Sequence, residues 1–200
     1  MNKILIGSGN QAKVDSYKEL LKEFKFEIVT LKDLNLKEPD ETGKTFEENA
    51  LLKAKYYYEK SGIPSLVDDG GMEIEALNGE PGVKSHRWLG HEMKDEEIIS
   101  EVLKRMKEVP DEKRGCKFSI VLALATPFGI FTSNGEIVGV IADKPAEKGI
   151  PHYPYRTVTY LPGYKKYWCE INEEESKILD HRTHALEKLH DILKELSKEE

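Results

Sequence analysis

Short apolar runs alternate with segments of helical periodicity in the N-terminal part of the chain, and this alternation constrains the fold most. The runs have the length and composition of buried strands and lie at 3–6, 26–31 and 65–67. A helix is predicted after Asn10, and Thr45 with Glu48 forms a capping box that begins another helix running to about Lys60. Strands that alternate with helices are typical of an α/β fold.

The second half of the chain has a different pattern, in which predicted strands follow one another closely. These strands lie at 117–126, 130–133 and 136–141. Pro127-Phe128-Gly129 has the composition of a hairpin turn, and helices are predicted at 95–107 and from Asp180 onwards. Hairpins beside strand–helix units favour a mixed sheet. A length of 200 residues suits one domain, 1–200, or one domain with two lobes around a cleft.

The composition restricts which classes of binding partner and which cellular compartment we expect for this chain. The formal net charge of −7 argues against a protein that binds nucleic acid or anionic membranes. Cys116 and Cys169 form no metal-binding pattern and predict reduced thiols in an intracellular protein. The longest apolar run, 120–125, is too short to cross a bilayer, and no signal-like segment is found. We therefore expect a soluble, cytoplasmic chain with no nucleic-acid or membrane partner.

Two adjacent carboxylates, Asp68 and Asp69, follow the apolar run that ends at Val67. Gly70 and Gly71 come next, and we expect them to let the backbone turn sharply and approach a ligand. Ligands of α/β sheets bind at the carboxyl ends of strands. Two carboxylates there suit a hard cation such as Mg²⁺, or one cation ligand and one general base. The alternative is an ordinary surface turn.

The segment from Ser8 to Lys13 lies between a predicted strand and a predicted helix. Asn10 is placed to cap that helix, whose unpaired amides and dipole attract anions. Lys13 lies one turn into the helix and is able to fold back onto a phosphate as a point charge. The alternative is a capped helix with a solvated lysine.

Polar side chains also gather around the start of the second predicted helix. Asn49 and Lys53 are four residues apart and share one helix face, and Glu41 lies in the loop just before the cap. A carboxylate, an amide and an ammonium in one place suit metal binding and phosphate binding. The alternative is a surface helix with local charge pairs.

Two arginines complete the set of candidate binding residues. Ser85 and Arg87 follow a Pro-Gly bend, and Arg182 stands at the predicted start of the last helix. An arginine binds a phosphate or a carbonyl edge through paired hydrogen bonds. For Arg182, a local salt bridge to Asp180 or Glu174 is the plainer interpretation.

In this order, these segments resemble the inosine triphosphate pyrophosphatase family, which hydrolyses non-standard purine nucleoside triphosphates. The family pattern (S/T)-G-N-x-x-K corresponds to Ser8–Lys13, and E-T-G-x-T-F-x-E-N-A-x-x-K-A corresponds to Glu41–Ala54. D-D-S-G-L-x-V-x-A-L-x-G-x-P-G-V-x-S-A-R survives in altered form as Asp68–Arg87. The agreement covers nearly the whole chain.

The resemblance implies roles for the matching residues. Glu41 and Asp69 would bind Mg²⁺, and Asp69 would also activate the attacking water. Asp68 would support the metal site, and Lys53 would neutralise charge on the transferring phosphate. The triphosphate would be held by Ser8, Asn10 and Lys13. Further contacts to the substrate would come from Asn49, Gly70, Ser85, Arg87, Tyr153, Arg156, Ser176, His181 and Arg182.

The resemblance also implies a reaction and an architecture. The family cleaves the bond between the α- and β-phosphates of a nucleoside triphosphate and releases a nucleoside monophosphate and pyrophosphate. The implied fold is α/β, with an elongated mixed central sheet flanked by helices and two lobes around an active-site cleft. The family is usually homodimeric.

The chain departs from the family pattern mainly where the base is recognised. F-G-Y-D-P is replaced by the run from Tyr153 to Thr157, in which the hydrogen-bond-accepting Asp becomes Arg156, a donor only. S-H-R becomes Asp180-His181-Arg182, and a lysine that usually precedes it is replaced by Ser176. The hypothesis is that the pyrophosphatase machinery is kept while the base pocket has changed its preference.

Two other functions stay open on the sequence alone. One is a nucleotide-binding regulator with little turnover, against which the intact Glu41, Lys53 and Asp69 argue. The other is a pyrophosphatase that acts on a pyrimidine or a standard nucleotide. A panel of substrates and an Asp69→Asn variant distinguish these functions.

Overall fold

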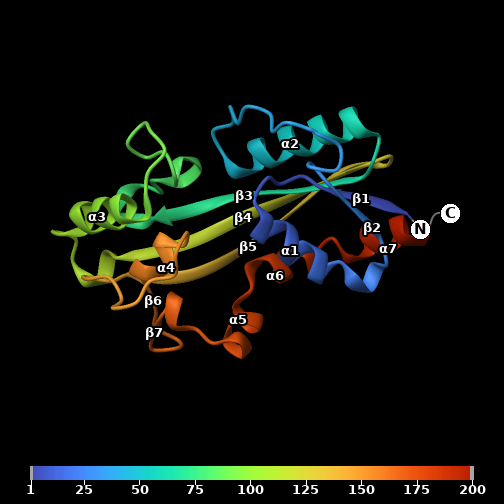
Figure 1. Ribbon diagram of the computed structural model, residues 1–200. Helices are drawn as coiled ribbons and strands as arrows, with labels where there is room; N and C mark the ends of the chain where they lie inside the picture. Colours follow the sequence, from blue (N-terminus) through green and yellow to red (C-terminus); the bar gives the residue numbers. More distant parts are fainter. Residues whose placement is uncertain (1, 199–200) are drawn as a thin grey trace. The chain divides into compact units, whose positions relative to one another are not determined.

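The computed structural model describes residues 2–198, which form a mixed sheet of seven strands with flanking helices (Figure 1). The strand order is β2-β1-β3-β4-β5-β6-β7. β1 pairs in parallel with β2 and β3, and β6 pairs antiparallel with β5 and β7. The strands are β1 (Lys3–Ile6), β2 (Glu27–Thr30), β3 (Ser65–Ile74), β4 (Gly115–Thr126), β5 (Gly129–Ile141), β6 (Thr159–Leu161) and β7 (Lys166–Tyr167). The predicted α/β fold with a mixed sheet is confirmed.

The chain divides into two compact units. Unit 1 comprises the described part of 1–69, 120–135 and 181–200, and unit 2 comprises 70–119 and 136–180. Strands β3, β4 and β5 contribute residues to both units.

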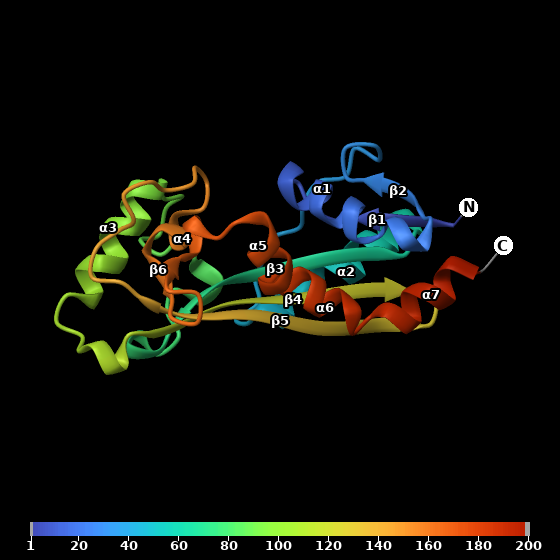
Figure 2. The same cartoon turned by 90° about the horizontal axis from the view of Figure 1, so that it is seen from below.

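In unit 1, helices cover both faces of the sheet (Figure 1). Helix α2 (Phe46–Ser61) lies on one face, and α1 (Gln11–Leu20), α6 (His181–Glu187) and α7 (His190–Lys198) lie on the other. Figure 2 shows α6 and α7 running along β4 and β5, and the Oγ of Ser133 in β5 donates to the carbonyl oxygen of Ala185 at 2.7 Å. The core under α2 is apolar and consists of Leu5, Val29, Leu31, Ala50, Ala54, Tyr57, Val67, Ala123 and Ala125.

Local caps explain where the first two long helices begin and end. The Asn10 side chain accepts hydrogen bonds from the backbone amides of Ala12 and Lys13, which begins α1. Thr45 accepts from the amide of Glu48 and begins α2 at the predicted residue, while Oε2 of Glu48 accepts from the amide of Lys44 and not from that of Thr45. α2 ends at Gly62, whose φ of 67° is in the left-handed region that glycine adopts without strain.

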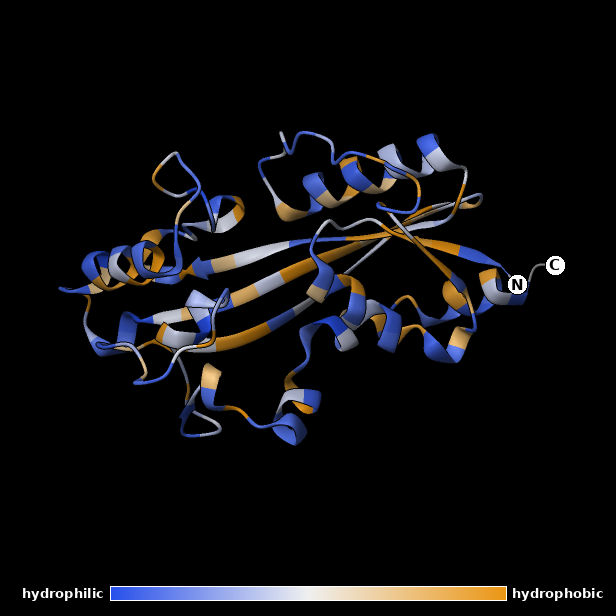
Figure 3. Cartoon of the chain, in the orientation of Figure 1, coloured by the Kyte–Doolittle hydropathy of each residue, from blue (hydrophilic) through white to orange (hydrophobic). Residues whose placement is uncertain are grey.

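Unit 2 is built around α3 (Asp95–Met106) and contains the shorter helices α4 (Pro154–Val158) and α5 (Glu173–Leu179). Single 3₁₀ turns lie at η2 (Glu75–Leu77), η3 (Gly82–Lys84), η4 (Asp111–Lys113) and η5 (Trp168–Glu170), while η1 (Lys22–Phe24) belongs to unit 1. One core cluster joins α3 and α4 to the strands and includes Met72, Ile74, Ile98, Val102, Met106, Tyr155 and Val158. Figure 3 shows hydrophobic stretches along the strands and mixed patterns on the helices.

Three predictions about elements were wrong. The chain does not turn at Gly70-Gly71, because β3 continues through both glycines to Ile74. The strands predicted at 130–133 and 136–141 form the single strand β5. The predicted C-terminal helix is two helices, α6 and α7, and α5 before them was not predicted.

Among residues 2–198, no helix combines the length and the apolar character that a transmembrane span requires.

Candidate active site

One group of polar side chains lies on the α2 face of unit 1, and we call Glu41, Asn49, Lys53 and Asp69 the acidic cluster. The Nζ of Lys53 lies 2.8 Å from Oε1 of Glu41 and 3.5 Å from Oδ1 of Asp69. It also donates to the backbone oxygen of Asp68 at 2.7 Å. The Nδ2 of Asn49 donates to Oδ2 of Asp69 at 3.0 Å. The structure therefore brings together the residues that the second motif and Asp69 predicted.

The acidic cluster is held in place by the start of α2. Asn49 and Lys53 occupy successive turns of one helix face, and both are buried. The backbone amide of Gly43 donates to Oδ1 of Asn49 at 2.8 Å, which fixes the loop that carries Glu41. One lysine between two carboxylates is a charge-assisted arrangement with a net negative charge, and this suits the binding of a cation.

Burial and charge act in opposite directions on the groups of the acidic cluster. Burial lowers the pKa of Lys53, but the neighbouring Asp69 and Glu41 outweigh it, and the net pKa is raised. Burial and the charge of Glu41 raise the pKa of Asp69, although Lys53 opposes them. Lys53 is therefore an ammonium, and Asp69 is less acidic than an ordinary aspartate.

A second group lies on the opposite face of unit 1, and we call Lys13, Tyr17, Asp68 and Arg182 the Asp68 cluster. The Nζ of Lys13 lies 2.7 Å from Oδ1 of Asp68. The Tyr17 hydroxyl donates to Oδ2 at 2.9 Å, and Nε of Arg182 lies 3.6 Å from the same oxygen. Burial raises the pKa of Asp68, but Lys13 and Arg182 outweigh it and hold the pKa well below its usual range.

The geometry of β3 separates the two adjacent aspartates. Successive residues of an extended strand point to opposite faces of a sheet. Asp69 follows the direction of Val67, which packs under α2, whereas Asp68 points to α1 and α6. The side chain of Asp68 therefore contacts two cations and a hydroxyl, whereas that of Asp69 lies in the acidic cluster.

The turn before α1 has the structure of a helix N-cap. Ser8 Oγ accepts from the amide of Asn10 at 3.2 Å, and Oδ1 of Asn10 accepts from the amides of Ala12 and Lys13. A side chain at Gly9 would meet Oε1 of Glu38, which is the far end of a flexible, exposed side chain. The turn and Lys13 belong to the same unit as both clusters.

The other predicted binding residues lie in unit 2, apart from His181, which is buried at the start of α6 in unit 1. Ser85 Oγ accepts from the amide of Met72 at 3.0 Å and donates to the carbonyl oxygen of Gly82 at 2.6 Å. A side chain at Gly71 would meet Ser85, so this glycine serves close packing of the chain on itself. Gly70, Arg87 and Ser176 are more exposed to solvent than Ser85.

Arg156 is stacked between two aromatic rings of unit 2. Its guanidinium carbon lies 4.6 Å from the centre of the Tyr153 ring and 4.8 Å from the centre of the Trp168 ring. Trp168 is buried, whereas Tyr153 is 38% exposed. A flat cation between two rings occupies the kind of space into which a flat heterocycle stacks.

Comparison with known proteins identifies the family. The sequence profile of the Ham1 family matches residues 4–192. The chain belongs to the Ham1 family. A dITP/XTP pyrophosphatase of Yersinia pestis is 36% identical over 201 aligned positions, which cover 98% of this chain and 100% of that protein. One of Haemophilus influenzae is 37% identical, covering 92% and 95%. The resemblance inferred from the motifs is confirmed.

Solved Ham1 structures share the fold. The HAM1 protein of Coxiella burnetii superimposes with a TM-score of 0.87 at 33% identity, and the alignment covers 98% of this chain and 100% of that protein. The Ham1 protein of Staphylococcus aureus gives a TM-score of 0.86 at 28% identity, covering 97% and 99%. The fold described above is therefore the fold of solved Ham1 proteins.

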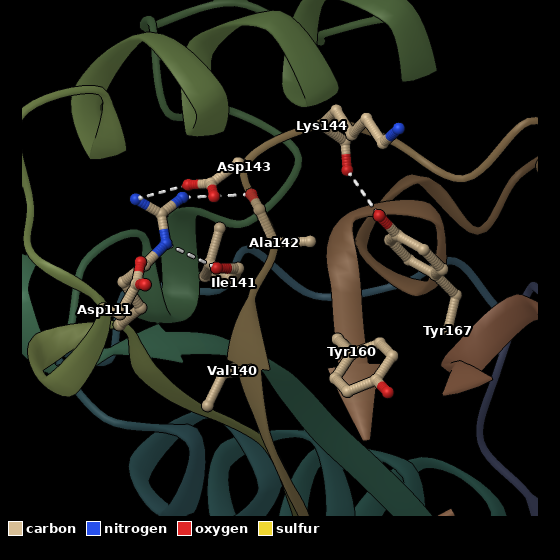
Figure 4. Close-up of a pocket in the computed structure, with 9 residues that line it drawn as sticks. Asp111, Val140, Ile141, Ala142, Asp143, Lys144, Tyr160 and Tyr167 are labelled. Atoms are coloured by element: carbon tan, nitrogen blue, oxygen red, sulfur yellow. Dashed lines mark hydrogen bonds and ion pairs between the residues drawn. The ribbon is translucent and has the colours of Figure 1, made fainter. Parts of the chain in front are cut away.

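A hollow of about 330 Å³ in unit 2 of this Ham1 chain contains none of the predicted site residues (Figure 4). It lies beside the buried Arg114, and Tyr167 donates to the carbonyl oxygen of Lys144 at its rim. Arg114 gives its N–H groups to four carbonyl oxygens, those of Met106, Val109, Ile141 and Ala142. Its hydrogen-bonding capacity is used in joining α3 to the end of β5, and the hollow is therefore a weak candidate for an active site.

The donor atoms of the acidic cluster fit a hard divalent cation. Within residues 2–198, no three His, Cys, Asp or Glu side chains gather as a ready metal site. Mg²⁺ ordinarily binds through one or two carboxylates and takes its other ligands from water and substrate phosphates. Glu41 and Asp69, which both approach the Nζ of Lys53, supply two such carboxylates.

Sequence reasoning missed two residues that the structure places beside predicted ones. Tyr17 stands in no motif, although its hydroxyl donates to Asp68. Trp168 lay in no motif, and yet it stacks on Arg156. For Tyr17 a signal existed, because it lies four residues after Lys13 and shares its helix face.

Proposed function

We propose that this Ham1 chain is a nucleoside triphosphate pyrophosphatase that converts non-standard purine nucleotides to the monophosphate and pyrophosphate. The observation that carries the proposal is the acidic cluster, in which Lys53 lies between Glu41 and Asp69. Its relatives bear the name dITP/XTP pyrophosphatase. Phosphoryl transfer needs positioned charge more than covalent chemistry, and this cluster supplies charge of both signs.

The charged groups of the two clusters have roles in this proposal. Asp69 orients the attacking water and accepts its proton, while Asn49 fixes one carboxylate oxygen through its hydrogen bond. Lys53 offsets the charge that develops on the phosphate. Lys13 and Arg182 hold the anionic part of the substrate, with Ser8 and Asn10 shaping the turn. Asp68 holds Lys13 and Arg182 and does not bind the metal.

We propose Mg²⁺ as the cofactor, held by Glu41 and Asp69. When bound there, it would neutralise phosphate charge and act as a Lewis acid. The two carboxylates beside a single lysine support this assignment, because they leave the acidic cluster with excess negative charge.

We propose that Arg156 alters the base preference of the enzyme. The family's acceptor at this position is replaced by a guanidinium that stacks on Tyr153 and Trp168. A donor favours bases that present acceptor atoms, such as the N7 and O6 edge of a guanine-type base. The contacts predicted for Asn49, Gly70, Ser85, Arg87, Tyr153, Ser176 and His181 are part of the same proposal.

An isosteric substitution of Asp69, the proposed general base, tests the pyrophosphatase activity. Asp69→Asn keeps the size of the side chain and removes the proton acceptor, so we expect turnover of dITP to fall at least about 100-fold, with nucleotide affinity within a few-fold of wild type. Pyrophosphate release with Mg²⁺ present is the measurement. Asp191→Asn is the matched control, because Asp191 is fully exposed in α7. A wild-type protein that binds dITP without releasing pyrophosphate would be a regulator, and the proposed activity would be wrong.

A panel of triphosphates tests the base preference separately. The panel contains dITP, XTP, the standard purine and pyrimidine nucleotides, and modified guanine nucleotides. If dITP and XTP are clearly the best substrates, the altered preference is refuted while the pyrophosphatase activity stands. We further propose that residues 1–200 act as one domain and that the enzyme is a cytoplasmic homodimer; light scattering in solution tests the dimer.

A further inference from the structure

The Tyr17 hydroxyl makes a buried contact that no part of the proposed chemistry has used. Tyr17 is 1% exposed, and its hydroxyl lies 2.9 Å from Oδ2 of Asp68, which is 3% exposed. Burial and the charge of Asp68 raise the pKa of Tyr17 well above its usual value, so the hydroxyl keeps its proton and donates it in the hydrogen bond.

The Asp68 carboxylate distributes its two oxygens among three donors. Oδ1 receives the ammonium of Lys13 at 2.7 Å, and Oδ2 receives the Tyr17 hydroxyl and lies 3.6 Å from Nε of Arg182. The Lys13 side chain is 29% exposed and the Asp68 side chain 1%. A ligand from solvent therefore meets Lys13, whereas Asp68 acts only through the groups that it holds.

We propose that Tyr17 is a positioning residue for phosphate binding, since its hydroxyl fixes the Asp68 carboxylate that orients Lys13 and Arg182. The inference rests on the proposed function, because it concerns the same bound triphosphate. Lys13 and Tyr17 lie one turn apart on α1, and Arg182 comes from α6. The carboxylate ties the two helices to β3, and Tyr17 is the neutral donor that fixes its rotation.

Loss of the hydroxyl removes a hydrogen bond to a charged group at a site without access to water. Such bonds are among the stronger ones in proteins. With phenylalanine at position 17, the Oδ2 atom loses its neutral donor, and the carboxylate turns towards its two cations. Lys13 and Arg182 then lose their common orientation, which weakens binding of the phosphates in the ground state and in the transition state alike.

The test compares Tyr17→Phe with wild type in two assays. We expect the KM for dITP to rise roughly tenfold with kcat within about twofold, which is the signature of lost uniform binding. The Kd for inorganic triphosphate, measured by calorimetry, is expected to rise by the same factor. Urea unfolding checks that the variant is folded, and Tyr17→Met, which fills the space without a donor, is the second variant.

Tyr57→Phe is the matched control. Tyr57 is 0% exposed and lies in the same unit, and its hydroxyl has no hydrogen-bond partner among the described residues. We expect this variant to keep the wild-type KM and the wild-type Kd for inorganic triphosphate. An equal loss in Tyr57→Phe would show a general packing effect and overturn the proposal.

A double-mutant cycle separates positioning through Asp68 from a merely structural role. In an Asp68→Asn background, Tyr17→Phe is expected to change the Kd for inorganic triphosphate by less than about twofold, because its partner is already altered. A full tenfold effect in that background, or no effect in the wild-type background, would overturn the proposal. If wild type releases no pyrophosphate, the proposed function fails, and the triphosphate titration still decides whether Tyr17 positions the anion site.

Discussion

Replacement of Arg114 by methionine is expected to destabilise the protein strongly, although the residue lies outside both clusters. The Arg114 side chain is 6% exposed and pairs with Asp143, which is 79% exposed. Its Nε donates to the carbonyl oxygen of Ile141 at 2.6 Å, and Nη1 donates to that of Met106 at 2.8 Å. These two bonds are buried, and two more go to half-buried carbonyls at the end of α3 and after β5.

The magnitude follows from these contacts. A hydrogen bond from a charged donor contributes about 1.5–3 kcal/mol, so the two buried bonds together amount to about 3–6 kcal/mol. Removing the guanidinium also relieves its own desolvation, which offsets part of the loss. The exposed pair with Asp143 adds little. We expect Arg114→Met to lower the free energy of unfolding by about 3–4 kcal/mol, a large share of the stability of a typical domain.

Urea unfolding followed by circular dichroism measures this loss. Arg105→Met is the control, because Arg105 is 32% exposed and pairs with the side chains of Glu80 and Glu101 and with the Trp88 ring. We expect it to cost less than about 1.5 kcal/mol. The reasoning is refuted if Arg114→Met costs under about 1 kcal/mol, or no more than the control.

Two further predictions concern packing and ionisation. Gly71→Ala places a methyl group against Ser85 and 2.7 Å from the carbonyl oxygen of Gly82. We therefore expect it to lower the free energy of unfolding by about 1–3 kcal/mol, measured by thermal or urea unfolding. Gly163→Ala meets open space and should change the free energy of unfolding by no more than about 0.5 kcal/mol. Burial raises the pKa of Cys116 to about 12. Iodoacetamide at pH 9 should therefore modify the half-buried Cys169 first and Cys116 only after unfolding. Modification of Cys116 in the folded protein would contradict this reasoning. Since the unfolded thiol ionises at its lower ordinary pKa, the contribution of Cys116 to stability is full below that pKa and declines as the pH rises towards 12.

Much of the fold was predictable because its signals are local. The N-caps at Thr45 and at Asn10 depend on bonds within a few residues, and both lie where the sequence placed them. The Gly70-Gly71 pair is the opposite case. Glycine permits a turn but does not enforce one, and distant packing against Ser85 keeps β3 extended.

The candidate site was predicted as a set of residues and not as an arrangement. The motifs named Glu41, Asn49, Lys53 and Asp69, and these four residues do meet. The partner of Asp68 was not predictable in the same way, since Lys13 is 55 positions away and Tyr17 is 51. Periodicity marks Tyr17 as a core residue, but it carries no information on what the hydroxyl of a core tyrosine binds.

The opposite directions of Asp68 and Asp69 have a consequence for how this protein tolerates changes in length. Inserting or deleting one residue in β3 ahead of the pair would exchange the two carboxylates between the sides of the sheet. An insertion would place Val67 opposite Lys13, and a deletion would place Gly70 opposite Asn49, so either change removes one of the two contacts. The number of residues in this strand is therefore constrained as firmly as their types, whereas a substitution on one face of the sheet leaves the contacts on the other face intact.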